Sequence, residues 1–251
     1  MLRKLVTTQV HSTADIRDFF DDFAHAYSER HGHPDRLLNY RIALIKRHAE
    51  LSGDDVVLDI GCGNGHHLFA LAGGIGRGVG VDLSPAMIGV AQERLRSSPA
   101  QGSLTFFSDD GEKLDTVPDG SVDLAICVGA FEHMLNKPAV LESAHRVLRL
   151  PGRFFCLTLN GGYFWYQTLA PLLGLETKHL STDKFLKRDE LLRLASEAGF
   201  RRIEVGHWTF IPKGDMPPAL GLICQGLDLA GRVFRINSLR GGLWACAWKE
   251  D

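Results

Sequence analysis

The sequence of 251 residues lacks the long apolar runs of an integral membrane protein, since no window approaches the roughly 20 uninterrupted apolar residues that a spanning helix needs. It also lacks an excess of charge of either sign. The formal net charge is −2, so there is no electrostatic case for a nucleic-acid partner. The five cysteines are scattered and show neither disulfide nor metal-ligand spacing, which predicts reduced thiols in a cytoplasmic protein.

Two further features are missing. Residues 1–18 contain early acidic residues and no long apolar core, so we expect no signal peptide. No close group of Asp, Glu and His side chains suits Mg²⁺ or Zn²⁺, so we expect no catalytic metal.

The composition, with 45% hydrophobic and 23% charged residues, is typical of a globular protein. We expect a single domain with a helical cap over 1–51, a core over 52–160 and a substrate-side part over 161–251.

The chain is organised around residues 56–65. Four apolar residues in the run 56–60 predict a strand that is buried on both faces, as in a parallel sheet. Glycines follow at every second position, at Gly61, Gly63 and Gly65, and a helix is expected from His66. Such a turn lets the backbone approach a ligand closely, and the helix start offers unpaired N–H groups. The third glycine comes one position earlier than in the dinucleotide pattern G-x-G-x-x-G.

A second strand over 78–82 ends on an acidic residue. Asp82 follows the glycine turn by about 20 residues, where the second strand of a doubly wound sheet meets a ribose. A carboxylate at this place can accept hydrogen bonds from both ribose hydroxyls. Ser84 and Pro85 then supply a cap and a first helical residue for the next helix.

Three strings together carry a family resemblance. Asp59-x-Gly61-x-Gly63-x-Gly65, the string GVDLSPAMI at 80–88 and the string GAFEHM at 129–134 follow successive expected strands. This order resembles class I methyltransferases that use S-adenosylmethionine, over about residues 50–160. The resemblance implies an α/β fold with a doubly wound, seven-stranded, mainly parallel sheet in the order 3-2-1-4-5-7-6, strand 7 being antiparallel. It implies S-adenosyl-L-methionine as cofactor and S-adenosyl-L-homocysteine as product.

The resemblance also implies roles for individual residues. Leu83 would pack on adenine and Met87 would line the same pocket. Asp110 would bind the adenine amino group, with Asp109 as the alternative, and Val128 would face the methionine part. Tyr27, on an expected N-terminal helix, would reach the ligand or simply pack in the core. The cofactor residues expected in this way are Asp59, Gly61, Cys62, Gly63, Asp82, Leu83, Met87, Asp110, Gly111, Val128 and Tyr27.

The substrate side is less specific. His133 is a candidate general base, because imidazole often has this role near neutral pH, although it can equally brace the next helix. Residues 160–187 are too long for a simple connection, which is typical of a functional loop. Its aromatic side chains predict a pocket for a small apolar or aromatic acceptor. The expected acceptor residues are Tyr163, Trp165 and Tyr166, with His179 as a second candidate base.

Several alternatives stay open at this point. A wide apolar arc on the helix expected over 217–236 favours packing into the domain over an apolar acceptor site or contact with a membrane surface. The sequence leaves peripheral lipid contact, the oligomeric state, and methylation at O, N or C undecided. A non-catalytic cofactor-binding module and a nicotinamide-dependent oxidoreductase on a similar sheet remain as alternative functions.

Overall fold

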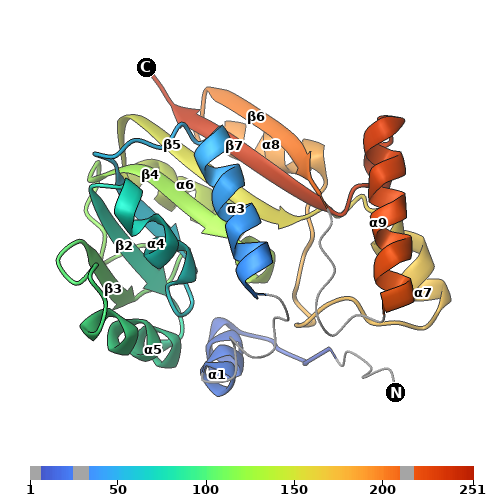
Figure 1. The fold of residues 1–251 in the computed structure, drawn as a ribbon, viewed down its shortest axis with the longest axis horizontal. Helices are drawn as coiled ribbons and strands as arrows, with labels where there is room; N and C mark the ends of the chain where they lie inside the picture. The colour runs from blue at the N-terminus through green and yellow to red at the C-terminus, as the bar shows by residue number, and fades with distance from the viewer. Residues whose placement is uncertain (1–6, 25–33, 210–217) are drawn as a thin grey trace.

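The computed structural model describes residues 7–24, 34–209 and 218–251, and within them one seven-stranded sheet forms the centre of the molecule (Figure 1). Its strand order is β3-β2-β1-β4-β5-β7-β6, which confirms the expected topology. β7 runs antiparallel to both of its neighbours, and the other neighbouring pairs are parallel. The strands are β1 (Val56–Ile60), β2 (Arg77–Asp82), β3 (Leu104–Ser108), β4 (Val122–Val128), β5 (Leu148–Leu159), β6 (Arg202–Trp208) and β7 (Gly242–Lys249).

Helices cover both faces of the sheet because successive residues of a strand point to opposite sides. In β4, Leu124 and Ile126 join one core cluster while Ala125 and Cys127 join the other. Two groups of helices complete these clusters. The first cluster is covered by α3 (Pro34–His48), α4 (His66–Leu71) and α5 (Pro85–Arg96), and the second by α6 (Lys137–Val147) and α8 (Arg188–Glu197). Short 3-10 turns are η1 (Ala72–Gly74), η2 (Phe131–His133) and η4 (Asn237–Leu239).

An N-terminal helix, α1 (Thr13–Phe23), lies across the edge of the sheet where the parallel strands end (Figure 1). Its Ser12 forms a capping box with Asp15. At its other end, Asp21 accepts hydrogen bonds from the Ser84 hydroxyl and from the backbone N–H of Ala86 at the start of α5. A carboxylate is favoured at a helix N-terminus, so this contact fixes α1 over the loops that follow the strands.

Some element boundaries differ from the sequence predictions. The helix expected over 138–150 ends at Val147, because Leu148 already pairs with Val122 of β4 and β5 starts there. The connection after β5 contains a π-helical turn, η3 (Trp165–Leu169), followed by α7 (Ala170–Leu172). The helix expected over 217–236 is α9 (Pro218–Val233).

The structure also describes the cysteines, the apolar helices and the possible metal ligands. All five cysteines are buried free thiols. No described helix is long and apolar enough to cross a bilayer. Within the described ranges, no group of three or more His, Cys, Asp or Glu side chains is placed to hold a metal ion.

Candidate active site

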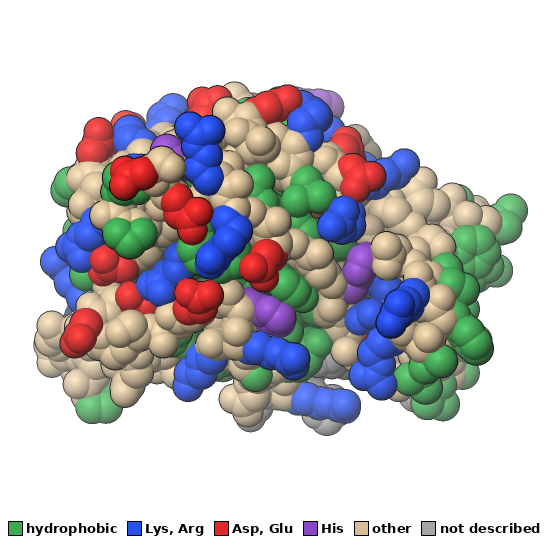
Figure 2. Space-filling view, turned by 90° about the horizontal axis from the view of Figure 1, so that it is seen from above, with side chains coloured by type: hydrophobic (Ala, Val, Ile, Leu, Met, Phe, Trp, Pro, Cys, Tyr) green, Lys and Arg blue, Asp and Glu red, His purple; other side chains and the backbone are tan. Residues whose placement is uncertain are grey.

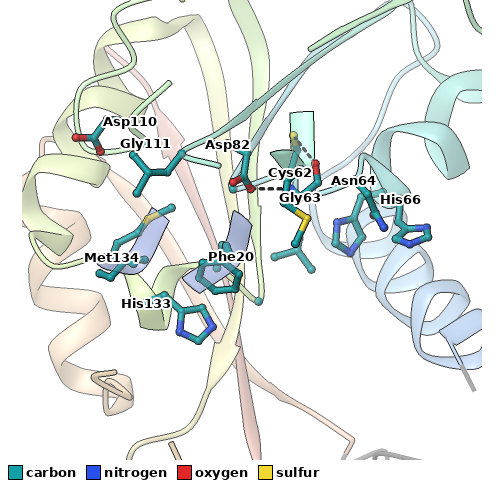
Figure 3. Close-up of a pocket in the computed structure, with 18 of the residues that line it drawn as sticks. Phe20, Cys62, Gly63, Asn64, His66, Asp82, Asp110, Gly111, His133 and Met134 are labelled. Carbon is teal, nitrogen blue, oxygen red and sulfur yellow. Dashed lines mark hydrogen bonds between the residues drawn. The ribbon is translucent and has the colours of Figure 1, made fainter. Parts of the chain in front are cut away.

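A cavity opens at the carboxyl ends of the parallel strands, where ligands bind in open α/β sheets (Figure 3). Its walls are the loops after β1, β2, β3 and β4, and α1 and α3 close it from the other side. Most of the residues expected from the sequence to bind ligands reach it. These are Gly61, Cys62, Gly63, Asp82, Leu83, Met87, Asp110, Gly111, Val128 and His133.

The glycine turn after β1 forms one wall because all three of its glycines have a positive φ, of 73°, 53° and 80°. A Cβ on Gly61 would lie 2.4 Å from the Ala130 Cβ, and one on Gly65 would lie 2.8 Å from the Phe106 ring. A Cβ on Gly63 would meet no protein atom within 4 Å. Two of the glycines are therefore needed for packing, whereas Gly63 presents open backbone to the cavity.

Asp82 links the second strand to this turn. Its Oδ2 accepts the N–H of Gly63 at 2.8 Å and its Oδ1 accepts the N–H of Ser84 at 2.9 Å. Burial raises the pKa of Asp82 to about 6, against the effect of these two N–H donors, and the nearby carboxylates of Asp59 and Asp21 raise it further. Additional hydrogen-bond donors from a ligand in the cavity would therefore stabilise the ionised form of this carboxyl group.

Asp59 does not line the cavity but lies behind it on β1. Its carboxylate is fully buried, and neither oxygen has a hydrogen-bond partner among the described residues. His67, which does line the cavity, places its Nδ1 3.5 Å from Oδ2 of Asp59. An acceptor that is buried without a donor is costly, so the nearby His67 ring is the group placed to offset the charge of Asp59.

Comparisons with known proteins agree with this geometry. Residues 57–152 match the family model of a methyltransferase domain. The ubiquinone biosynthesis O-methyltransferase of Thiobacillus denitrificans is 31% identical over 180 residues, which are 68% of this chain and 75% of that relative. The chain belongs to the class I S-adenosylmethionine-dependent methyltransferases.

Other similar proteins have the same type of domain. The demethylmenaquinone methyltransferase of Symbiobacterium thermophilum is 28% identical over 172 residues, 58% of this chain and 68% of that one. The methyltransferase solved in complex with the Haloferax volcanii Trm112 activator has a TM-score of 0.67 at 23% identity, and the match covers 92% of this chain and 98% of that chain. At that identity the likeness shows the fold. Membership of the family makes S-adenosylmethionine, not a nicotinamide dinucleotide, the cofactor of this enzyme.

The residues of this methyltransferase fit that cofactor. The cavity has a polar part with the carboxylates of Asp82 and Asp110, and apolar side chains at Leu83 and Met87 beside it. The open backbone at Gly63 leaves room that a side chain would fill. Hydrogen-bond acceptors next to apolar walls suit a nucleoside, whose ribose donates hydrogen bonds and whose base needs flat apolar contacts.

The opposite part of the cavity is apolar and contains His133 (Figure 3). The ring of His133 contacts the edge of Phe20 from α1, and Leu37 and Leu38 from α3 line the same space. His133 Nδ1 lies 2.6 Å from Oδ1 of Asp183, which is buried. The other ring nitrogen, Nε2, therefore remains available on the ring that lines the cavity.

Asp183 was not found from the sequence, and it comes from the long connection after β5. Its second oxygen accepts the backbone N–H groups of His179 and Leu180, each at 3.0 Å. Burial opposes ionisation of Asp183, but the hydrogen bond and charge of His133 together with these N–H donors hold its pKa below the ordinary value. The pair is thus a carboxylate that orients an imidazole, as in nucleophile-activating sites of other enzymes.

Several expected acceptor residues lie elsewhere. Tyr163 and Trp165 are buried in a separate cluster with Ala170 and Cys224, against which Tyr166 packs, and none of the three aromatic residues lines the cavity. These aromatic side chains pack between α7 and α9, and the burial of their apolar rings stabilises the contact between the two helices. Burial raises the pKa of both tyrosines well above the ordinary value, so they stay protonated.

Two other expected residues are not at the cavity wall. The His179 ring lies with its centroid 6.2 Å from that of His133 and does not line the cavity. Tyr27 lies outside the described residues.

Arg41 is a cavity residue that the sequence analysis missed. It projects from α3 and lies so close to Gly129 that a Cβ there would be 3.1 Å from its Nη2. Its guanidinium makes no hydrogen bond or ion pair with any other described residue. No local pattern singled it out, because only the packing of α3 over the loop after β4 brings it to the cavity.

Proposed function

We propose that this methyltransferase methylates a hydroxyl oxygen of a small acceptor that is apolar or aromatic. The observation that carries the proposal is the His133–Asp183 pair, which lies at the apolar part of the cavity. The names of two similar proteins, a ubiquinone biosynthesis O-methyltransferase and a demethylmenaquinone methyltransferase, support an acceptor of the ring type used in quinone synthesis.

Residues of the polar part would hold the cofactor. In this proposal Asp82 accepts hydrogen bonds from the ribose hydroxyls, Leu83 and Met87 pack on adenine, and Asp110 accepts from its amino group. Arg41 lies beside Gly129, where it would pair with the carboxylate of the methionine part. When bound, S-adenosylmethionine supplies an electrophilic methyl group on its sulfonium.

The protein then has two tasks, which are to orient the acceptor and to receive its proton. Asp183 accepts the Nδ1–H of His133, which fixes the tautomer with a lone pair on Nε2. Nε2 would take the hydroxyl proton while the acceptor oxygen gains the methyl group, whose bond to sulfur breaks so that the electron pair leaves with S-adenosylhomocysteine. Asp183 stabilises the imidazolium that results, which later returns its proton to solvent. Phe20 lines the same cavity, so its ring can pack against an aromatic acceptor.

A choice of acceptors tests the reaction type. Purified enzyme is incubated with S-adenosylmethionine labelled in the methyl group and with a catechol that carries an apolar chain. The same ring with its hydroxyls already methylated and the corresponding ring amine serve as controls. We expect transfer to the catechol, none to the methylated ring and much slower transfer to the amine. Transfer only to the amine, or only to protein or nucleic acid in a cell extract, would contradict the proposal.

The raised pKa of Asp82 predicts how cofactor affinity depends on pH. Because its pKa is about 6, well above the ordinary value, the carboxyl group becomes protonated as the pH falls through 6. A protonated carboxyl accepts ribose hydrogen bonds more weakly than a carboxylate. We therefore expect S-adenosylhomocysteine to bind about tenfold more weakly at pH 5 than at pH 7. Calorimetry at both pH values measures this, and Asp82→Asn should bind weakly at both. An unchanged wild-type affinity would show that Asp82 does not hold the ribose.

A further inference from the structure

Helix α9 turns most of its large apolar side chains to the outside of the protein, whereas a helix packed into a domain normally buries them. Its buried positions are occupied by the small residues Gly221, Cys224 and Gly231 and by Asp228, which is 2% exposed. Leu222 and Ile223 of the same helix are 69% and 55% exposed. The helix is therefore amphipathic in the reverse sense, with its apolar face turned to the outside.

The inner face is firmly held, so this orientation is part of the fold. Asp228 forms an ion pair with Arg240 at 3.0 Å, and both side chains are nearly buried. Cys224 packs with Tyr163 and Ala170, which join α9 to α7. Rotating the helix to bury its leucines would expose these contacts and break the ion pair.

Exposed residues of α7 extend the apolar face of α9. Figure 1 shows α7 beside α9 at one end of the molecule, and Figure 2 shows hydrophobic side chains gathered at that end with Lys or Arg side chains next to them. We call this face the α7–α9 surface. Its largest exposed side chains are Leu172, Leu173, Leu222, Ile223, Val233 and Phe234.

The exposed charges within the two segments that carry this surface have one sign. Segment 164–175 contains no charged residue, and the only acid of segment 218–236 is Asp228, which is buried and paired. Arg232 and Arg235 are exposed at the C-terminal end of α9. A second copy that met this face with the same two segments would bring arginines together without a carboxylate from those segments, so symmetric self-association is disfavoured.

We propose that the α7–α9 surface docks the enzyme peripherally on an anionic lipid bilayer. The exposed leucines and Phe234 would enter the boundary between headgroups and acyl chains, while Arg232 and Arg235 contact the anionic headgroups. No described helix can cross a bilayer, so the contact is peripheral. This docking does not depend on the methylation proposed above. Lipid binding is measured without turnover, so one proposal can fail while the other holds.

Flotation of the 251-residue chain with vesicles tests the docking. One set of vesicles is pure phosphatidylcholine and the other contains phosphatidylglycerol in addition. We expect binding to the anionic vesicles that decreases as salt is raised, and much less binding to the neutral ones. The variant Leu222→Ser/Phe234→Ser should lose about tenfold or more in affinity, and each of Arg232→Gln and Arg235→Gln about fivefold.

Matched controls lie away from this surface. Leu150 is 52% exposed on β5, and Arg96 is exposed at the end of α5, so Leu150→Ser and Arg96→Gln should bind vesicles as the wild type does. Because all substituted side chains are exposed, their thermal unfolding should be unchanged. The proposal is overturned if the wild type does not float with anionic vesicles, or if controls and test variants lose binding equally. It is also overturned if sedimentation shows a dimer in the absence of lipid that Leu222→Ser/Phe234→Ser dissociates.

Discussion

Substituting Gly63→Val is expected to abolish binding of S-adenosylhomocysteine while the protein stays folded. A Cβ at this position would meet no protein atom within 4 Å, and because Gly63 lines the cavity, the added side chain would take up space that the cofactor needs. The φ of 53° adds a strain of about 1–2 kcal/mol for a residue with a Cβ, which a folded domain normally tolerates. Calorimetry of binding and circular dichroism of the fold measure the two effects separately.

Gly120 offers a matched control for the strain. Its φ is 58° and a Cβ there also meets no atom within 4 Å, but it lies in the turn before β4 and does not line the cavity. Gly120→Val should therefore lose similar stability and keep the cofactor affinity. If Gly63→Val retained binding, or if both variants lost it equally, the glycine turn would not be the cofactor wall.

Substituting His133→Ala is expected to lower kcat by about 10²–10⁴ with a hydroxyl acceptor, because the proton would have no positioned base to receive it. Affinity for S-adenosylhomocysteine should stay near that of the wild type, since His133 belongs to the apolar part of the cavity. Single-turnover measurements with saturating cofactor and acceptor give the chemical rate. With an amine or activated carbon as the true acceptor, the loss would be small.

Two further variants separate a base from a structural histidine. Asp183→Asn should lower kcat by at least about tenfold with little change in KM, because the amide no longer fixes the tautomer and charge of His133. His179→Ala removes a neighbouring ring that does not line the cavity, so its kcat should stay near the wild-type value. If His179→Ala lost as much activity as His133→Ala, the proton acceptor would be assigned to the wrong histidine.

The sheet could be predicted from the sequence because its signals are local. Mainly apolar runs at 56–60 and 122–128, each interrupted by one aspartate, mark strands that are buried on both faces, and helices between them require parallel connections. The positions of the glycines and of Asp82 also follow from chain order, since every parallel strand ends at the same edge. Together with the family resemblance, they predicted most of the residues that the structure brings to one cavity.

Other parts of the protein depend on contacts between distant segments. His133 and Asp183 are 50 residues apart, and no periodicity or motif links them. The aromatic cluster after β5 has the composition of a pocket, yet Tyr163 and Trp165 are buried under α9. Arg41 reaches the cavity only because α3 packs across the loop after β4.

The orientation of helix α9 could not be predicted from the sequence. Its pattern correctly predicted a helix with a wide apolar arc, but not which side of that helix faces the sheet. The buried ion pair of Asp228 with Arg240 and the packing of Cys224 decided the orientation and left Leu222 outside. Local pattern therefore predicted the strands and the glycine turn, and the resemblance to the methyltransferase family predicted the strand order that the structure has. Tertiary packing alone decided which side chains meet in the site and which remain on the surface, because these depend on segments that are far apart in the chain.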